Sequence, residues 1–142
     1  MTDRRANYAL VTFMEHLGEA ESRLDVEWAE FMGDRTSEAT FEVPADDPTD
    51  AYLQLQAYDV GTYGHDIVLN GESISGFDIP PGQGWQSWMD AITGAALQEG
   101  ENTIRFVREA DSTDSFVVGN VVINWKEPVG DGAGPVDGGT DT

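Results

Sequence analysis

The chain has 142 residues, of which 27 are Asp or Glu and seven are Lys or Arg, so its formal net charge is −20 at pH 7. This length predicts one domain with a substantial core, and a hydrophobic content of 39% excludes a disordered acidic chain. The absence of cysteine excludes disulfide bonds and thiolate metal sites. The scattered arginines argue against nucleic acid as a partner, and no apolar run is long enough to span a membrane.

Acidic residues occur along the whole length, whereas Lys126 is the single lysine. So many carboxylates repel one another at low ionic strength, but at molar salt the screening length falls to about 3 Å and most of this repulsion disappears. The composition therefore resembles that of proteins from salt-in halophiles, such as haloarchaea. The first residues lead into no hydrophobic region of a signal peptide, so we expect a cytoplasmic protein or a component of a virus particle.

Hydrophobicity alternates with a period of two along most of the chain, which predicts β-strands. Asn70-Gly71 is a strong hairpin signal within this pattern. About eight short strands predict an all-β protein, an antiparallel jelly-roll β-sandwich over residues 1–127, and the Gly/Asp-rich segment 128–142 is predicted to be a flexible tail. The expected strands cover residues 7–14, 24–32, 38–43, 51–58, 65–69, 72–74, 102–108 and 116–125.

One segment departs from this pattern. Trp85, Trp88, Met89 and Ile92 recur at helical spacing, which predicts one short helix near residues 85–93. In that helix Trp88 would point into the core and Trp85 would lie partly outside. Two further tryptophans, Trp28 and Trp125, lie on rows that we expect to face inward.

The second half of the chain carries a series of motifs in a recognisable order. The segment AYLQLQAYD is followed by IVLNGESI, by GWQSWMDAI, and by a Leu-x-x-Gly-x-Asn-x-Ile pattern that runs from Leu97 to Ile104. From Ala51 to Trp125 the chain resembles the second half of galactose-binding-like jelly-roll domains. The resemblance implies a haloarchaeal family of this type with ligands bound at loops on one end of the sandwich. It does not define the ligand, because the architecture serves sugar binding, adhesion, accessory domains of enzymes and virion components.

Strand direction indicates which loops share that end. Successive strands of an antiparallel sandwich alternate in direction, so the connections 33–36, 59–64, 76–84 and 109–115 should lie together. The connections at 15–23, 44–50, 70–71 and 98–101 should lie at the other end, and Arg4 and Arg5 should enter near the first. The candidate ligand-binding residues of the first end are Arg35, Asp59, Tyr63, Trp85, Asp111 and Asp114.

These residues suit a carbohydrate-like ligand. Carboxylates would accept hydrogen bonds from sugar hydroxyls, Arg35 would donate, and Tyr63 or Trp85 would stack on a sugar ring. The alternative is that loops of an acidic protein collect Asp simply for solvation. No cofactor is expected, although Asp111 and Asp114 together with Asp59 suit a structural calcium ion. A solvated turn is the alternative to this calcium site.

Catalysis is not expected, because the two histidines, His16 and His65, lie far apart in the sequence and no nucleophile or phosphate-binding motif occurs. The sequence thus predicts a non-catalytic binding module for carbohydrate-like ligands. The alternative is a structural jelly-roll subunit of an oligomeric assembly or a halophilic virus particle. Segments 7–14 and 116–125 are apolar on both faces, which favours a protein partner, a homo-oligomer included.

We expect the folded state to depend on salt. In dilute buffer the tertiary spectroscopic signal should be lost, because unscreened carboxylates repel one another, and concentrated KCl should restore it. Near-ultraviolet circular dichroism across a KCl series measures this directly. A signal that persists in dilute buffer would show that the acidity has a cause other than a saline habitat.

Overall fold

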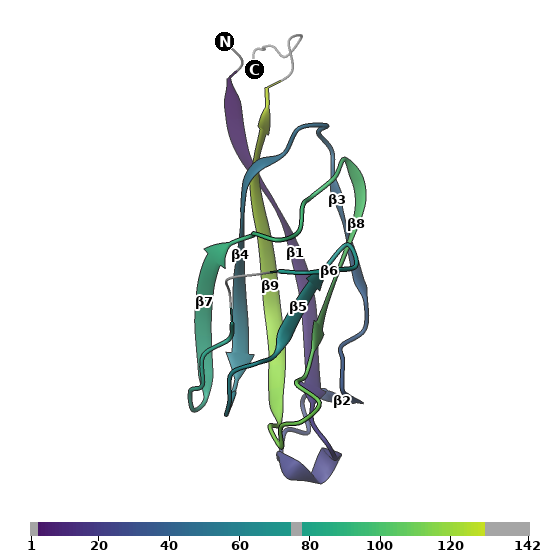
Figure 1. The fold of residues 1–142 in the computed structure, drawn as a ribbon, viewed down its shortest axis with the longest axis vertical. Helices are drawn as coiled ribbons and strands as arrows, with labels where there is room; N and C mark the ends of the chain where they lie inside the picture. Colours follow the sequence, from purple (N-terminus) through teal and green to yellow (C-terminus); the bar gives the residue numbers. More distant parts are fainter. Residues whose placement is uncertain (1–2, 75–77, 130–142) are drawn as a thin grey trace.

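The computed structural model describes residues 3–74 and 78–129, which form two β-sheets packed into a sandwich (Figure 1). The five-stranded sheet has the order β2-β1-β9-β4-β7, and the four-stranded sheet has the order β3-β8-β5-β6. The strands are β1 (Arg4–Leu17), β2 (Glu30–Gly33), β3 (Ala39–Val43), β4 (Thr49–Tyr58), β5 (Asp66–Leu69), β6 (Glu72–Ser73), β7 (Trp85–Ala91), β8 (Gly100–Val107) and β9 (Phe116–Pro128), with a 3₁₀ turn, η1, at Glu21–Arg23.

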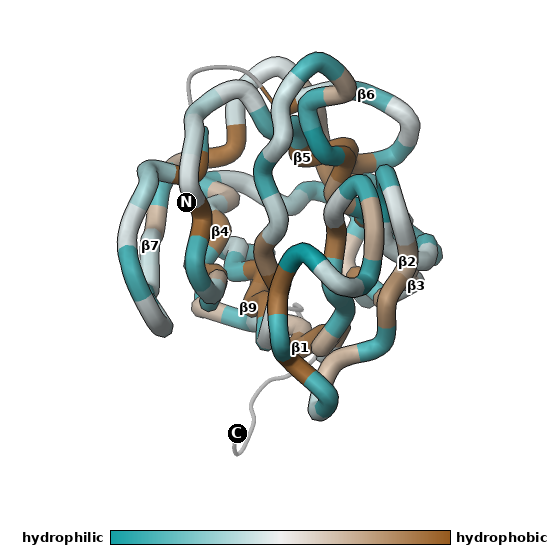
Figure 2. The backbone as a smooth tube through the Cα atoms, turned by 90° about the horizontal axis from the view of Figure 1, so that it is seen from below, coloured by the Kyte–Doolittle hydropathy of each residue, from teal (hydrophilic) through white to brown (hydrophobic). Residues whose placement is uncertain are grey.

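The core lies between the two sheets and is built from the inward rows of each strand. In β4, Leu53, Leu55 and Ala57 are buried, while the residues between them face outward. Phe13 of β1 and Phe106 of β8 join the two layers edge to face, with ring centroids 5.5 Å apart. Figure 2 looks along the strands and shows hydrophobic residues concentrated on β1, β4, β5 and β9. The predicted antiparallel β-sandwich is therefore confirmed.

The short helix predicted near residues 85–93 is wrong. Residues Trp85–Ala91 form β7, which pairs with β4 at the edge of the five-stranded sheet. An edge strand is partly exposed on both faces, so it needs no contrast between apolar and polar rows, and its tryptophans happen to fall at helical spacing. Trp88 is consequently 39% exposed and is not the core residue that helical spacing predicts.

A second difference concerns the first connection. Instead of an antiparallel strand over residues 24–32, the structure has only β2, which runs parallel to β1. The connection after β1 therefore lies at the same end as the 33–36 loop, and Gly18 N–H donates to the Gly33 carbonyl there. Arg4 and Arg5 lie at the opposite end, where Arg4 contacts Asp47.

The two tryptophans expected on inward rows, Trp28 and Trp125, differ in burial. Trp125 is buried, as predicted, and its indole N–H donates to the Glu127 carboxylate (2.8 Å). Trp28 is 48% exposed, contrary to the prediction, because it lies in the loop before β2 rather than on an inward row. Of the predicted tail, residues 128–142, Pro128 is the last residue of β9, and residues 130–142 lie outside the described residues. No helix in the described part of the chain is long and apolar enough to cross a membrane.

The Leu-x-x-Gly-x-Asn-x-Ile pattern has a clear structural basis. The Asn102 amide, fully buried, accepts hydrogen bonds from the Gln98 N–H (2.9 Å) and the Asn70 side chain (2.8 Å). It also donates to the carbonyls of Gln98 (2.9 Å) and Gly100 (3.0 Å). Gly100 has a φ of 92°, which an L side chain rarely adopts. Asn102 thus joins the turn before β8 to the β5–β6 hairpin.

We expect Asn102→Ala to lower the free energy of unfolding by about 2–3 kcal/mol, because several buried partners lose their hydrogen bonds. Denaturant unfolding in concentrated KCl measures the difference. Asn124→Ala is the matched control, since this partly buried amide forms its one side-chain hydrogen bond among the described residues with Gln54. Equal losses in the two variants would contradict the role given to Asn102.

Candidate functional site

The outward side chains of β1, β9, β4 and β7 form one continuous face of the five-stranded sheet, called here the outer face. Directly paired residues of neighbouring strands point to the same side, so the register arranges this face in transverse rows. The rows are Tyr8–Asn124–Tyr52–Ala91, then Leu10–Val122–Gln54–Met89, then Thr12–Asn120–Gln56–Ser87, and last Tyr58–Trp85. None of the side chains in these four rows is charged, and the next row towards the Arg4 end of β1 contains Lys126 opposite Ala6.

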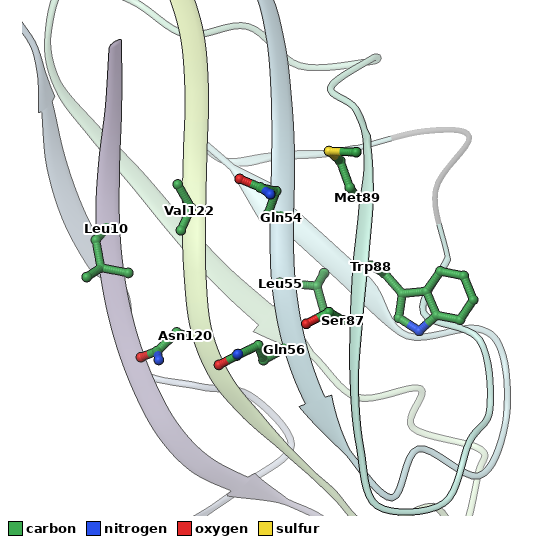
Figure 3. A pocket seen from close by; sticks show the side chains of 9 residues that line it. All are labelled: Leu10, Gln54, Leu55, Gln56, Ser87, Trp88, Met89, Asn120 and Val122. Atoms are coloured by element: carbon green, nitrogen blue, oxygen red, sulfur yellow. The ribbon is translucent and has the colours of Figure 1, made fainter.

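The middle of the outer face is hollowed, with a volume of about 360 Å³. Figure 3 shows Val122, Gln54 and Met89 in one row and Asn120, Gln56 and Ser87 in the next. The lining residues are Leu10, Gln54, Leu55, Gln56, Ser87, Trp88, Met89, Asn120 and Val122. A hollow lined by nine uncharged residues is unexpected in a chain with 27 acidic ones, and it offers amides and apolar groups side by side.

Two hydrogen bonds hold amides of this face in place. Asn124 donates to the Gln54 side-chain oxygen (3.0 Å), and the Thr12 hydroxyl donates to the Asn120 side-chain oxygen (2.9 Å). The Gln54 and Asn120 amide nitrogens keep their donors for other partners, because each bond uses only the oxygen of that side chain. The face therefore presents oriented donors to the solvent.

Three aromatic rings meet at one end of the hollow and are called here the aromatic platform. Trp28 lies 5.2 Å from Tyr58 and 5.6 Å from Trp85, and Tyr58 lies 5.3 Å from Trp85, measured between ring centroids. Trp28 and Trp85 are 48% and 47% exposed. Half-exposed rings in mutual contact form a rigid apolar surface, because each ring is held by the other two.

Gly119 of β9 allows this arrangement. A Cβ atom on Gly119 would lie 2.8 Å from Cζ3 of Trp85 and 3.5 Å from Cβ of Gln56. The Trp85 indole therefore reaches from β7 across β4 and lies against the backbone of β9. Glycine in a strand interior often marks such a close approach.

The end of the sandwich at which the sequence predicts the ligand, called here the loop end, brings together most of the connections that were expected there. Asp59 accepts a hydrogen bond from the Gly84 N–H (2.6 Å), and Asp78 accepts one from the Gly64 N–H (2.9 Å). The guanidinium of Arg108 pairs with Asp34 (2.8 Å). The polar side chains of these loops thus fasten the loops to one another.

Asp114 is the most enclosed of the predicted ligand residues. Its carboxylate accepts hydrogen bonds from the Gly61 and Thr62 amides (2.9 and 3.2 Å) and from Nε2 of His65 (2.7 Å). Nδ1 of His65 accepts from the Glu109 N–H, so the ring proton lies on Nε2. Burial raises the pKa of the Asp114 carboxyl, but these hydrogen bonds outweigh burial and hold the pKa below its ordinary value.

The other predicted residues lie apart from one another. Trp85 belongs to the aromatic platform, whereas Arg35 pairs through its backbone with Val107 in the opposite sheet. Tyr63 and Asp111 are exposed on their loops. Within residues 3–74 and 78–129, no group of three or more His, Asp or Glu side chains is arranged to hold a metal ion.

Sequence reasoning placed the candidate ligand residues at the loops and named only Trp85 among the residues of the outer face. One signal pointed to it, because Tyr52, Gln54, Gln56 and Tyr58 alternate with the buried residues of β4. A strand face that only contacts solvent does not need two tyrosines and two glutamines at successive outward positions. The contributions of Trp28, Asn120 and Met89 had no such signal, since they come from distant parts of the chain.

Comparison with known proteins found one family and several solved structures that are similar to this chain. Residues 5–127 match a family of unknown function (DUF7383), and no curated protein matches the chain in sequence. The CBM36-1 domain of a multidomain xylanase from the hindgut metagenome of Trinervitermes trinervoides has a TM-score of 0.56 at 15% identity, over 82% of this chain and 96% of that domain. The GH26-CBM35 β-(1,4)-mannanase of Podospora anserina has a TM-score of 0.44 at 14% identity, over 96% of this chain and 29% of that one.

The hydrogen bonds of Asp114 predict an acid-dependent loss of stability. Its pKa in the folded protein is below the ordinary value of 3.8, so its stabilising contribution is complete above that value and is lost as the pH falls through the folded pKa. We expect Asp114→Asn to be less stable than the parent near neutral pH and to lose less stability between about pH 6 and pH 3. Denaturant unfolding at both pH values tests this, with exposed Asp111→Asn as the control. The same pH dependence in the parent and in Asp114→Asn would contradict it.

Proposed function

The chain belongs to this family of unknown function, and we propose that it is a non-catalytic carbohydrate-binding module whose site is the outer face of the five-stranded sheet. One observation carries the proposal: three mutually contacting aromatic rings, of which Trp28 and Trp85 are half-exposed, lie beside rows of uncharged amides. The similarity to the CBM36-1 domain supports it through the fold.

The chemistry of the face fits a sugar. A pyranose ring presents apolar C–H groups on its faces and hydroxyls around its rim. The C–H groups would pack on Trp28 and Trp85, which offer flat apolar area at little cost in side-chain entropy. The hydroxyls would bond with the amides of Gln54, Gln56 and Asn120, which both donate and accept.

The lack of charge is also functional in this proposal. We infer a saline habitat from the acidic composition, and concentrated salt weakens interactions between exposed charges. Stacking and neutral hydrogen bonds are not screened in this way. A neutral face therefore binds under conditions in which a charged one would lose affinity.

The same face argues for binding without hydrolysis. Glycosidases use two carboxyl groups that flank the scissile bond. The residues that line the hollow include no Asp or Glu. A bound sugar would thus meet donors, acceptors and aromatic rings, but no general acid or base from these residues.

We expect Trp28→Ala and Trp85→Ala each to weaken binding about tenfold or more, since each removes a stacking surface. Affinity electrophoresis against soluble neutral polysaccharides (glucans, xylans and mannans) in concentrated KCl measures this. Tyr63→Ala is the matched control, because Tyr63 is also an exposed aromatic residue but lies on the loop end. A loss confined to Tyr63→Ala would move the site to the loops, and retardation by no polysaccharide would refute the proposal.

A second function is favoured by one feature of the same face. Leu10 and Met89 are strongly exposed and lie in one row with Val122, which suits a contact between subunits of an assembly. Light scattering on the same samples distinguishes the two. A monomer leaves the face free for a sugar, whereas an oligomer that Leu10→Ser dissociates would assign it to assembly.

A further inference from the structure

The outer face has aromatic groups at both ends of its hollow. The aromatic platform occupies the end nearest the loop 59–64, and Tyr52 and Tyr8 occupy the other. Tyr52 and Tyr58 lie on the same strand, β4, and both side chains belong to the outer face. The six residue-to-residue steps from Tyr52 to Tyr58 span roughly 20 Å, which is the length of about four pyranose units in an extended chain.

From this arrangement we propose that the face binds an extended, uncharged glycan of about four sugar units that lies along β4. The inference rests on the proposed function and specifies its ligand. The platform would hold one terminal unit of the bound segment, and Tyr52 with Tyr8 would contact the unit at the opposite end.

The groups between the two ends support a path parallel to the strands. Gln54 and Gln56 are successive outward residues of β4, and in the neighbouring strand β9 Asn120 and Asn124 lie on either side of Val122. Outward residues of a strand recur about every 7 Å, so a glycan of four units along β4 would meet the Gln54 and Gln56 amides between its two ends. The apolar row of Leu10, Val122 and Met89 crosses this path and would contact C–H groups of the ligand.

The charge of the molecule selects against acidic glycans. The residues of the hollow are uncharged, while the chain as a whole carries a net charge of −20. An anionic chain would gain no ion pair with these residues and would be repelled by the rest of the surface, most strongly at low salt. A neutral chain is free of this penalty.

Gly119 is a positioning residue of this site. Its missing side chain allows the Trp85 indole to lie against β9, within the path proposed for the ligand. Gly119→Ala keeps all three rings but places a methyl group 2.8 Å from Cζ3 of Trp85, so the indole must shift. Affinity should therefore fall for ligands of every length, although no aromatic group is removed.

Isothermal titration with linear gluco-, xylo- and manno-oligosaccharides of one to six units tests the inference in concentrated KCl. For the series that binds, affinity should rise about tenfold or more from two to four units and then change less than about twofold up to six. An affinity that is the same for one unit as for six would overturn the extended site. An affinity that continues to rise through six units would also overturn the assigned length.

Two variants separate the ends of the site. Tyr52→Ala should weaken the binding of four units about tenfold and leave the binding of two units unchanged, whereas Trp85→Ala should weaken both. Tyr8→Ala serves the same purpose if Tyr52→Ala does not fold, because Tyr8 is far more exposed. Equal effects of Tyr52→Ala on short and long ligands would contradict the inference. If neither oligosaccharides nor polysaccharides bind the parent protein, the proposed function itself fails.

Discussion

The two longest strands, β1 and β9, lie side by side in the five-stranded sheet, and their antiparallel pairing positions everything packed around them. The ladder runs from Arg4 opposite Pro128 to Leu17 opposite Phe116. It brings the two ends of the described chain together (Figure 1) and buries one row of each strand against the second sheet. β4 pairs with β9 and β7 pairs with β4, so this ladder also sets the register of the outer face.

Buried polar groups form hydrogen bonds that hold loops and turns outside the β1–β9 ladder in place. Asp114 joins two loops at one end of the sandwich, Asn102 joins two turns, and the Glu127 carboxylate accepts from Trp125 and Arg5 near the chain ends. Groups of this kind look functional in a sequence because they are polar and lie near loops. Their hydrogen-bonding capacity is used inside the protein, since a buried carboxylate or amide without partners is costly.

The acidic side chains that the structure describes lie outside the hollow of the outer face. The acidic side chains maintain solvation and a strong negative field, whereas the hollow of the outer face presents only neutral groups. In the proposed function this separation lets the protein keep its affinity in concentrated salt, because stacking and neutral hydrogen bonds need no unscreened charge. The aromatic platform then supplies the contact area and the amides supply the orientation.

Local patterns in the sequence determined the fold class. The alternation in β4 identified both its buried row and its outward row, and the pattern ending in Ile104 identified the turn before β8. Tertiary structure alone decided that Trp85 belongs to an edge strand, that Trp28 is exposed, and that these two rings meet Tyr58. The physical reason is that periodicity reports which side of a strand is buried, whereas a site built from β1, β4, β7, β9 and a loop depends on register between segments far apart in the chain.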